Sequence, residues 1–143
     1  TDIPKLEDRA SACGSVDPIS VLLAEDDNIS QLAIKMMLEQ SGHRVTIADN
    51  GQTALTMLEN NSFDLILMDV QMPVLDGMEA TRLIRRCRDS RYDRNIPIIA
   101  MTAFAMVGDR EKFLNAGMDD YLAKPVDIYD LKQAIERTLT KNN

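Results

Sequence analysis

Short apolar runs alternate with amphipathic stretches along most of this 143-residue chain, and this alternation constrains its fold more than any other feature. Each run is three or four residues long, is mainly aliphatic, and is bounded by turn-forming or charged residues. Continuous apolar runs of this length are typical of strands that are buried on both faces. The five runs lie at residues 21–24, 45–48, 65–68, 98–101 and 121–123.

The stretches between the runs show helical periodicity and carry signals for helix ends. Gly42 and Gly117 stand where the C-terminus of a helix favours a left-handed residue. Asp127 is expected to cap the last helix, and Asp130 in its first turn suits the helix dipole. The predicted helices lie at about 28–41, 51–60, 77–89, 108–116 and 127–140. Five such repeats predict an α/β fold, a doubly wound parallel sheet with helices on both faces.

The composition is that of a globular protein, with 45% hydrophobic and 27% charged residues. No apolar run approaches the roughly 20 residues that a membrane span needs, and residues 1–20 lack the features of a signal peptide. We therefore expect a cytoplasmic domain that makes no membrane contact. Cys13 and Cys87 lie far apart and in no metal-binding pattern, so both are expected to be free thiols.

The net charge of −7 argues against direct binding to nucleic acid, which requires a basic surface. A local exception is a cluster of arginines between Arg82 and Arg94. We interpret it as a solvated helix face and loop rather than as a docking patch for an acidic partner. Residues 1–18 show no sustained periodicity and are expected to be a linker or disordered lead from a longer protein. The folded domain is then expected to span residues 19–141.

Polar residues directly follow four of the five apolar runs. Glu25 and Asp26 follow the first run, Asp69 the third, Thr102 the fourth and Lys124 the fifth. Because the carboxyl ends of parallel strands lie along one edge of a sheet, where ligands bind, these five side chains should converge. Three neighbouring carboxylates repel one another unless a cation is present. A cluster of oxygen ligands without His or Cys favours a hard ion, Mg²⁺ (or Mn²⁺).

This constellation suits transfer of a phosphoryl group to a carboxylate. An ionised Asp69 could attack phosphorus and form an acyl phosphate. Lys124 and Thr102 could hold the phosphoryl oxygens, and a metal ion would offset the repulsion between them and the carboxylates. Each residue also has an ordinary structural explanation, because Glu25–Asp26 and Thr102 could cap helices and Lys124 could extend over the rim of the sheet. The five together at the strand ends favour the phosphoryl site.

Four segments of the chain, in the same order and spacing, resemble the receiver domain of two-component response regulators. The segments are residues 21–27, 68–77, 99–103 and 121–125. The resemblance covers about residues 20–140. The sequences of 68–73 and 77–82, and of 108–111 and 116–121, are similar to those of receivers attached to hybrid sensor histidine kinases. It implies a flavodoxin-like sheet of five parallel strands in the order 2-1-3-4-5.

The resemblance also implies roles for the residues at the strand ends. Asp69 would be the phosphoacceptor, and Asp26 would bind Mg²⁺ directly with Glu25 assisting. The backbone carbonyl of Gln71 would complete the metal ligands that the protein supplies.

The family further implies a switch beside the site. Thr102 and Lys124 would contact the phosphoryl oxygens, and the rotamer of Tyr121 would change with the position of Thr102. The bond between Lys124 and Pro125 is expected to be cis, which is rare enough to be a sharp test.

The function implied by the resemblance is that of a phosphorelay component. The domain would accept a phosphoryl group from the phosphohistidine of a histidine kinase or a histidine phosphotransfer domain, and would relay the signal by a conformational switch or by onward transfer. Beyond weak self-phosphorylation and autodephosphorylation it would not be an enzyme, and it would be a monomer or weak dimer. It could form the cytoplasmic part of a membrane-bound sensor kinase.

His43, the only histidine, follows Gly42 at a turn and is expected to be a surface residue, so the donor must be another domain or protein.

The predicted helix 28–41 is apolar over a wider arc than core packing requires. One face carries Ala33, Ile34, Met37 and Leu38, and it is flanked by Ile29, Leu32 and Met36. Two interpretations remain open: a broad core stripe, or a docking face for a helix that bears the donor histidine.

Two other classes of protein fit the sequence less well. A metal-dependent phosphatase with an aspartyl-phosphate intermediate usually needs a second aspartate two residues beyond the nucleophile, where this chain has Gln71. A nucleotide-binding module would show G-x-G-x-x-G or a P-loop after the first run, and neither is present.

Overall fold

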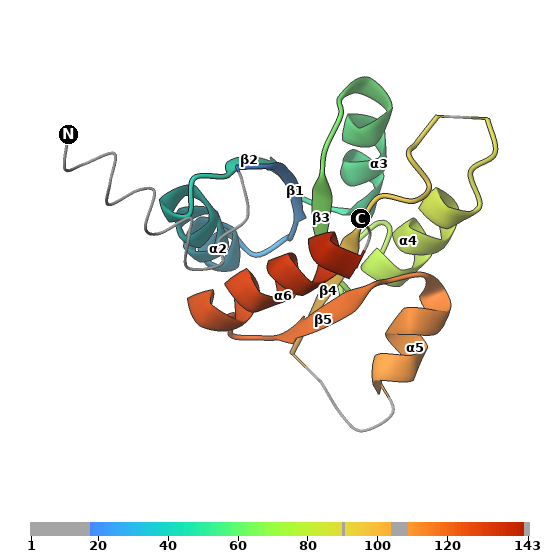
Figure 1. Cartoon of the computed structure of the whole chain (residues 1–143). Coiled ribbons are helices and arrows are strands. Elements are labelled where there is room, and N and C mark those ends of the chain that lie inside the picture. The colour runs from blue at the N-terminus through green and yellow to red at the C-terminus, as the bar shows by residue number, and fades with distance from the viewer. Residues whose placement is uncertain (1–17, 90, 104–108, 142–143) are drawn as a thin grey trace.

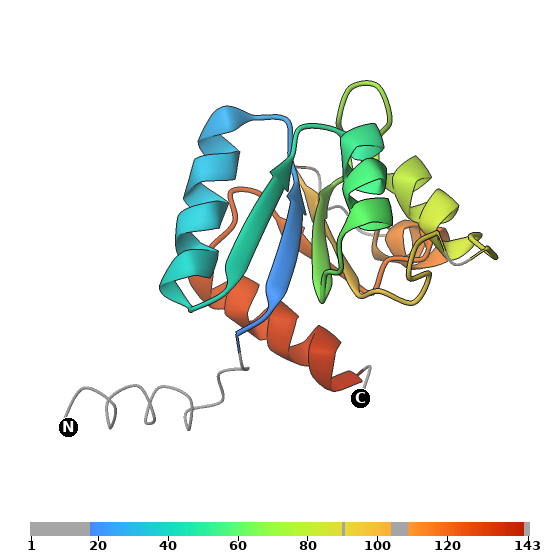
Figure 2. The ribbon, with the colours of Figure 1, turned by 90° about the horizontal axis from the view of Figure 1, so that it is seen from above.

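The computed structural model describes residues 18–89, 91–103 and 109–141, which form a twisted parallel sheet covered by helices (Figures 1 and 2). The strands are β1 (Ser20–Ala24), β2 (Arg44–Ala48), β3 (Leu65–Asp69), β4 (Ile98–Thr102) and β5 (Asp120–Ala123). Their order in the sheet is β2-β1-β3-β4-β5, and every neighbouring pair is parallel. The predicted doubly wound α/β fold and its strand order 2-1-3-4-5 are confirmed.

Helices cover both faces of this sheet. They are α2 (Asn28–Gln40), α3 (Gly51–Asn60), α4 (Gly77–Arg85), α5 (Asp109–Ala116) and α6 (Ile128–Lys141). Helices α2 and α6 lie on one face, and α3, α4 and α5 lie on the other (Figure 2).

Each strand contributes to two hydrophobic cores, because successive side chains of a strand point to opposite faces. Leu22 and Ile66 pack in the core under α3, α4 and α5, whereas Leu23 and Leu67 pack in the core under α2 and α6. Burial of each such side chain stabilises the fold by about 1.5–3 kcal/mol. Both faces are covered, which explains why the strands read as continuous apolar runs.

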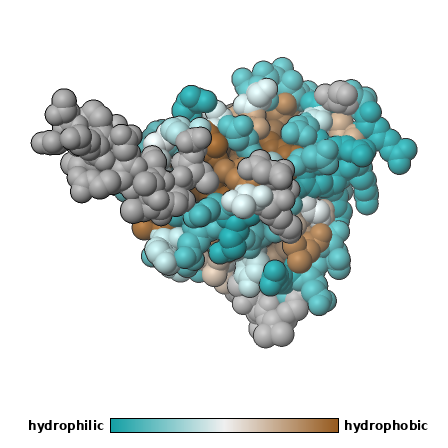
Figure 3. Space-filling view, in the orientation of Figure 1, coloured by the Kyte–Doolittle hydropathy of each residue, from teal (hydrophilic) through white to brown (hydrophobic). Residues whose placement is uncertain are grey.

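Most large apolar side chains lie inside these cores, and the face seen in Figure 3 is largely hydrophilic with apolar patches between. Among the described residues, the large apolar side chains that stay exposed are Ile29, Leu32, Met36, Val74, Leu83, Leu114 and Tyr129. Three of these seven side chains lie on α2, more than on any other element.

The helices that follow β1, β2, β3 and β5 begin with a polar cap at the same edge of the sheet. The side chains of Asp27, Asn50 and Asp76 accept the backbone N–H of the third residue after each, at 2.8–2.9 Å. Asp127 caps α6 as predicted, because its Oδ2 accepts the N–H of Tyr129 at 2.9 Å. The positive ends of these helix dipoles therefore face the edge where the strands end.

The left-handed helix ends are also confirmed, with φ of 92° at Gly42 and 107° at Gly117. Helix α4, however, ends at Arg85, earlier than the predicted end of the helix 77–89. The guanidinium of Arg85 donates to the carbonyls of Gly117 and Ile96, each at 2.7 Å, and pairs with Asp119 at 3.0 Å. Burial lowers the pKa of Arg85, and Asp119 works against this. Arg85 therefore connects α4 to the segments before β4 and β5, and it is not part of a solvated arginine face.

His43 is buried, so the prediction that it is a surface turn residue is wrong. Its ring Nδ1 accepts the backbone N–H of Ile19 at 3.1 Å, and the backbone N–H of His43 donates to the carbonyl of Leu38 at 3.0 Å. The side chain closes the gap between the start of β1 and the turn after α2. Burial lowers the pKa of His43, which favours the neutral ring that can accept this hydrogen bond.

The predicted linker at residues 1–18 lies, except for Pro18, outside the described residues. Within the part of the chain that the structure describes, no helix combines the length and the apolar character needed to cross a bilayer.

Candidate functional site

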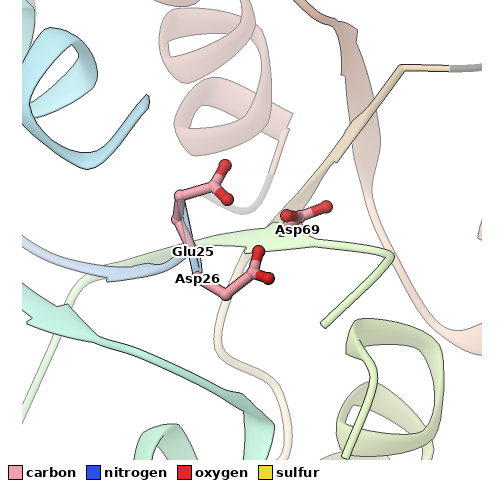
Figure 4. Close-up of side chains that lie close together, drawn as sticks. All are labelled: Glu25, Asp26 and Asp69. Atoms are coloured by element: carbon pink, nitrogen blue, oxygen red, sulfur yellow. The ribbon is translucent and has the colours of Figure 1, made fainter. Parts of the chain in front are cut away.

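Three carboxylates meet at the carboxyl ends of two neighbouring strands. Glu25 and Asp26 directly follow β1, and Asp69 is the last residue of β3, which pairs with β1 along its length. Each of the three offers an oxygen within 4.8 Å of the others, and Figure 4 shows the side chains facing a common space. Glu25 and Asp69 are 0% and 4% exposed, whereas Asp26 is open to solvent. The convergence predicted from the strand ends is thus present.

Lys124 reaches into this cluster from the end of β5. Its Nζ lies 3.0 Å from Oδ2 of Asp69 and 2.5 Å from Oε1 of Glu25. Burial alone would lower the pKa of Lys124, but its bonds to the two carboxylates outweigh burial and raise the pKa. The lysine therefore bridges the two buried carboxylates, and the alternative in which it extends over the rim of the sheet is wrong.

Thr102 lies between the phosphoacceptor candidate and the lysine. It ends β4, which separates β3 from β5, and it is 3% exposed. Its carbonyl accepts the backbone N–H of Lys124 at 2.8 Å, so the two strand ends are joined at the site. The bond between Lys124 and Pro125 is cis, as predicted.

The loop after Asp69 packs closely against the end of β3. Asp69 Oδ1 accepts the backbone N–H of Gln71 at 3.1 Å. Gly77 starts α4 so close to the strand that a Cβ there would lie 2.1 Å from the carbonyl oxygen of Asp69. Only glycine allows this approach, and it fixes α4 directly beneath the candidate phosphoacceptor.

The loop after β1 is held by hydrogen bonds of its own. Glu25 Oε2 accepts the N–H of Asp27 at 3.0 Å, and Oδ2 of Asp27 caps α2 through the N–H of Ser30. The bond from Ser30 lowers the pKa of Asp27. Because Asp27 is the cap, the alternative in which Glu25 and Asp26 only cap the helix is wrong, and both are left for the site.

The donor set fits a divalent cation. Burial raises the pKa of Glu25, and the pairing with Lys124 works against this. Three carboxylates and one ammonium leave an excess of negative charge, since Lys124 balances only one of them. Carboxylate oxygens without a nitrogen or sulfur ligand are the donors that Mg²⁺ and Mn²⁺ prefer.

Two neighbours of the site were not predicted from the sequence. Gln31, on α2, donates through Nε2 to the carbonyl of Glu25 at 2.6 Å and to Oδ1 of Asp49 at 2.9 Å. The signal for Gln31 is a polar residue that falls on the buried side of α2, where Ile34 and Leu38 also lie. Nothing in the sequence marks Asp49, which directly follows β2.

The apolar flank of α2 is exposed, so it does not belong to the core, and its role as a docking face stays a prediction. Ile34 and Leu38 are 2% and 1% exposed and face the core. By contrast Ile29, Leu32 and Met36 are 80%, 61% and 51% exposed. The broad core stripe is therefore wrong, and Ala33, expected on the core face, is exposed as well. The exposed residues Ile29, Leu32 and Met36 form what we call the α2 face.

Tyr121, the predicted switch residue, is half-buried on β5. Its ring centroid lies 5.9 Å from that of Phe113 on α5. Residues 104–108, which come shortly after the end of β4, lie outside the described residues, and the coupling of Tyr121 to Thr102 stays a prediction.

The strand order and the residues at the strand ends together define the class of the chain, an α/β signalling domain. The sequence model of the response regulator receiver domain matches residues 21–136, and the chain belongs to this family. It is therefore a receiver domain of two-component and phosphorelay signalling, and the phosphatase and nucleotide-binding alternatives are set aside.

One similar protein is the sensor histidine kinase GacS of Pseudomonas protegens, which is 41% identical over 115 residues and 80% of this chain. The chain spans only 12% of that kinase, and it spans a similarly small share of the other curated relatives that it matches. The similarity is thus to one domain of much longer proteins.

Two solved receiver-domain structures share the fold of this chain, with closely similar TM-scores. The receiver domain of the sensor histidine kinase PA1611 from Pseudomonas aeruginosa has a TM-score of 0.76 and 44% identity, covering 87% of this chain and 99% of that one. It was solved with a magnesium ion coordinated in the active-site cleft. The receiver domain of Ssk1 from Saccharomyces cerevisiae, solved with the histidine phosphotransfer protein Ypd1, has a TM-score of 0.77 and 33% identity, covering 85% and 88%.

Proposed function

We propose that Asp69 of this receiver domain accepts a phosphoryl group from a phosphohistidine, with the help of a divalent cation. The observation that carries the proposal is the convergence of Glu25, Asp26, Asp69 and Lys124 at the strand ends. Neither an N-cap nor a surface charge explains two buried carboxylates bridged by a lysine beside an exposed third.

The transfer needs only groups that lie at this edge of the sheet. An oxygen of Asp69 attacks phosphorus, the new O–P bond forms as the N–P bond of phosphohistidine breaks, and the histidine nitrogen keeps the electron pair. The product is an acyl phosphate, and no general base is required because the attacking carboxylate carries no proton. Lys124, 3.0 Å from Asp69, stabilises negative charge on the phosphoryl oxygens together with the hydroxyl of Thr102.

Glu25, Asp26 and Asp69 would hold the Mg²⁺ or Mn²⁺ ion, with the backbone carbonyl of Gln71 as a further ligand. When bound, the ion offsets the repulsion between these carboxylates and the incoming phosphoryl oxygens.

The α2 face is proposed as the docking surface for the donor. Its three apolar side chains, Ile29, Leu32 and Met36, lie on the helix that begins directly after the acidic loop. Val74, 82% exposed in the loop after Asp69, adds apolar surface on the other side of the site. A helix that presents a phosphohistidine could bury these side chains while its histidine reaches Asp69.

The signal would leave the site through Thr102 and Tyr121. A phosphoryl group on Asp69 would draw the hydroxyl of Thr102 toward it, and the ring of Tyr121 would turn inward. The surface formed by α5, β5 and α6 would then change between two states.

In its wider setting, residues 19–141 would form one cytoplasmic receiver module of a hybrid histidine kinase. It would act as a monomer or weak dimer, without binding nucleic acid. Its own chemistry would be limited to slow self-phosphorylation from small donors and slow hydrolysis of the acyl phosphate.

Intact mass spectrometry after incubation with a small phosphoramidate donor and Mg²⁺ tests the chemistry. We expect a gain of one phosphoryl group in the wild type and in Asp64→Asn, and none in Asp69→Asn. Asp64 is a matched control because it is an exposed aspartate before β3, where it accepts the N–H of Ser20. A wild type that stays unmodified would overturn the proposal.

Docking is tested separately with a charge on the α2 face. Met36→Glu should slow transfer from a phosphohistidine protein and leave phosphorylation by the small donor unchanged. The control Gln40→Glu places the same charge at an exposed position near the end of α2. Equal loss with both donors would argue against a docking role.

A further inference from the structure

The amide of Gln31 is buried on a helix face that otherwise packs apolar side chains. Gln31 is 9% exposed and lies between Ile34 and the start of α2. Its Nε2 uses both donors, one to the carbonyl of Glu25 at 2.6 Å and one to Oδ1 of Asp49 at 2.9 Å. A buried amide that is paired on both sides fixes its partners, because each would lose its hydrogen bond if the amide moved.

The same residue also holds the other end of the acidic loop. The backbone N–H of Gln31 donates to the carbonyl of Asp27 at 2.9 Å. Gln31 thus binds the carbonyls of Glu25 and Asp27, the two residues that flank Asp26. Asp26 is the exposed carboxylate of the cluster, and its backbone is held between these two points.

Glu25 is restrained at further atoms. Its backbone N–H donates to the carbonyl of Ala48 at 3.0 Å, and its Oε2 accepts the N–H of Asp27 at 3.0 Å. The carbonyl is the group that links Glu25 to Asp26, and Gln31 supplies its partner. Without this bond, the peptide between the two metal-binding carboxylates could rotate.

Asp49 anchors the amide from the other side. It follows the end of β2, the edge strand next to β1. Because Gln31 bonds Asp49 and Glu25 at once, it connects α2 with the ends of β1 and β2. The carboxylate of Asp49 therefore orients the amide that in turn orients the loop.

We propose that Gln31, anchored by Asp49, is a positioning residue that sets the affinity of the acidic loop for its divalent cation. This rests on the proposed metal-dependent function of the same site. Partners that orient metal ligands from outside the coordination sphere typically change metal affinity by about 10–100-fold when they are removed.

The test is a calorimetric titration with Mg²⁺ alone, so it does not depend on whether a donor phosphorylates Asp69. Gln31→Met keeps the length and helix propensity of the side chain and removes both donors. Its Kd for Mg²⁺ is expected to rise about 10-fold. Ile34→Val is the control, because it loosens the same helix through the core without touching the loop. In the metal-free protein, hydrogen exchange at the amide of Asp27 should also be faster in Gln31→Met than in Ile34→Val.

A second pair of variants keeps the proposal testable if Gln31→Met does not fold. Asp49→Asn and Asp49→Ala remove the same charge, but only alanine removes the oxygen that anchors the amide. Asp49→Ala should therefore bind Mg²⁺ more weakly than Asp49→Asn. A Kd for Gln31→Met that equals that of Ile34→Val, or equal affinities of the two Asp49 variants, would overturn the proposal.

Discussion

Replacement of Gly77 by alanine is expected to damage both the stability of the domain and the reaction at Asp69. A Cβ at position 77 would lie 2.1 Å from the carbonyl oxygen of Asp69 and 2.7 Å from Cγ of Met68. Carbon and oxygen atoms of this kind approach to about 3.3 Å in proteins. Helix α4 and the end of β3 must therefore separate by roughly 1 Å, since the nearest atom belongs to the backbone and cannot rotate away.

Two opposing effects set the size of the change in stability. Overpacking costs about 1–3 kcal/mol, whereas the better helix propensity of alanine returns up to about 1 kcal/mol. The unfavourable contact outweighs the gain in helix propensity, with a net loss of about 1–2 kcal/mol and a Tm lowered by about 4–8 °C for a domain of this size. The loss of activity should be larger, because a displacement of 1 Å at a reacting group can cost about 100-fold in rate.

The assay combines thermal unfolding with the rate at which a small donor phosphorylates Asp69, measured well below both melting temperatures. Gly42→Ala is the matched control. Gly42 has a φ of 92°, but the nearest atom to a Cβ there is 3.9 Å away, in Pro18. Alanine at this position should lose about 1–2 kcal/mol through backbone strain and keep the wild-type rate, because Gly42 lies at the opposite edge of the sheet.

A Gly77→Ala protein with the wild-type Tm and rate would refute this reasoning, because it would mean that α4 is not seated against Asp69. Equal losses of rate in both glycine variants would also refute it. In that case general destabilisation, and not displacement of Asp69, would control the reaction.

Substitutions of three ionisable side chains, Lys124, His43 and Arg85, test their separate roles in the reaction and in stability. Lys124→Met should slow phosphorylation by the small donor by roughly 100–1000-fold, as loss of one charge-stabilising donor does elsewhere; a near-normal rate would exclude Lys124 from the reaction. Burial lowers the pKa of His43, so below about pH 6.5 the unfolded chain binds a proton that the native chain does not. The stability that His43 contributes is thus complete above that pH and is lost as the pH falls through the folded pKa, by at most about 1.4 kcal/mol per pH unit. In urea denaturation, the free energy of unfolding of His43→Gln should fall less between neutral and acidic pH than that of the wild type. Arg85→Ala should lose about 2–4 kcal/mol in the same measurement, because three carbonyls and the carboxylate of Asp119 lose their charged donor. Arg82→Ala, which breaks only an exposed pair with Glu79, should scarcely change stability.

The sheet and its strand order could be predicted because helices cover both faces. All residues of β3 (65–69) are buried, so its sequence is a continuous apolar run up to the final aspartate. Loops and surface helices do not show such a run. The structural role of Arg85 could not be predicted, because its partners are carbonyls of residues outside α4. The guanidinium of Arg85 donates hydrogen bonds to the carbonyls of Gly117 and Ile96, and no sequence pattern near position 85 predicts these partners. His43 was misplaced for the same reason, since its partner is Ile19.

The members of the site could be predicted from their position at the strand ends, but their restraints could not. Parallel strands bring Glu25 and Asp69 together whatever the intervening loops do. Whether Asp26 or Asp27 caps α2 depends on the backbone conformation of the loop after β1. The structure shows that Asp27 is the cap. The amide of Gln31 likewise finds Asp49 only after β2 has paired with β1.

The buried charges of the site lower the stability of the domain, and the two hydrophobic cores offset this loss. Burial raises the pKa of Glu25, so its stabilising contribution is present below the unfolded pKa and is lost as the pH rises through the folded pKa. At neutral pH, above the unfolded pKa, Glu25 therefore opposes folding, and its pairing with Lys124 offsets only part of this. The two continuous cores beneath the strands supply the stability that tolerates it. A glutamine at position 25 would remove this cost together with one of the proposed metal ligands, so we attribute the buried acid to the proposed function rather than to folding.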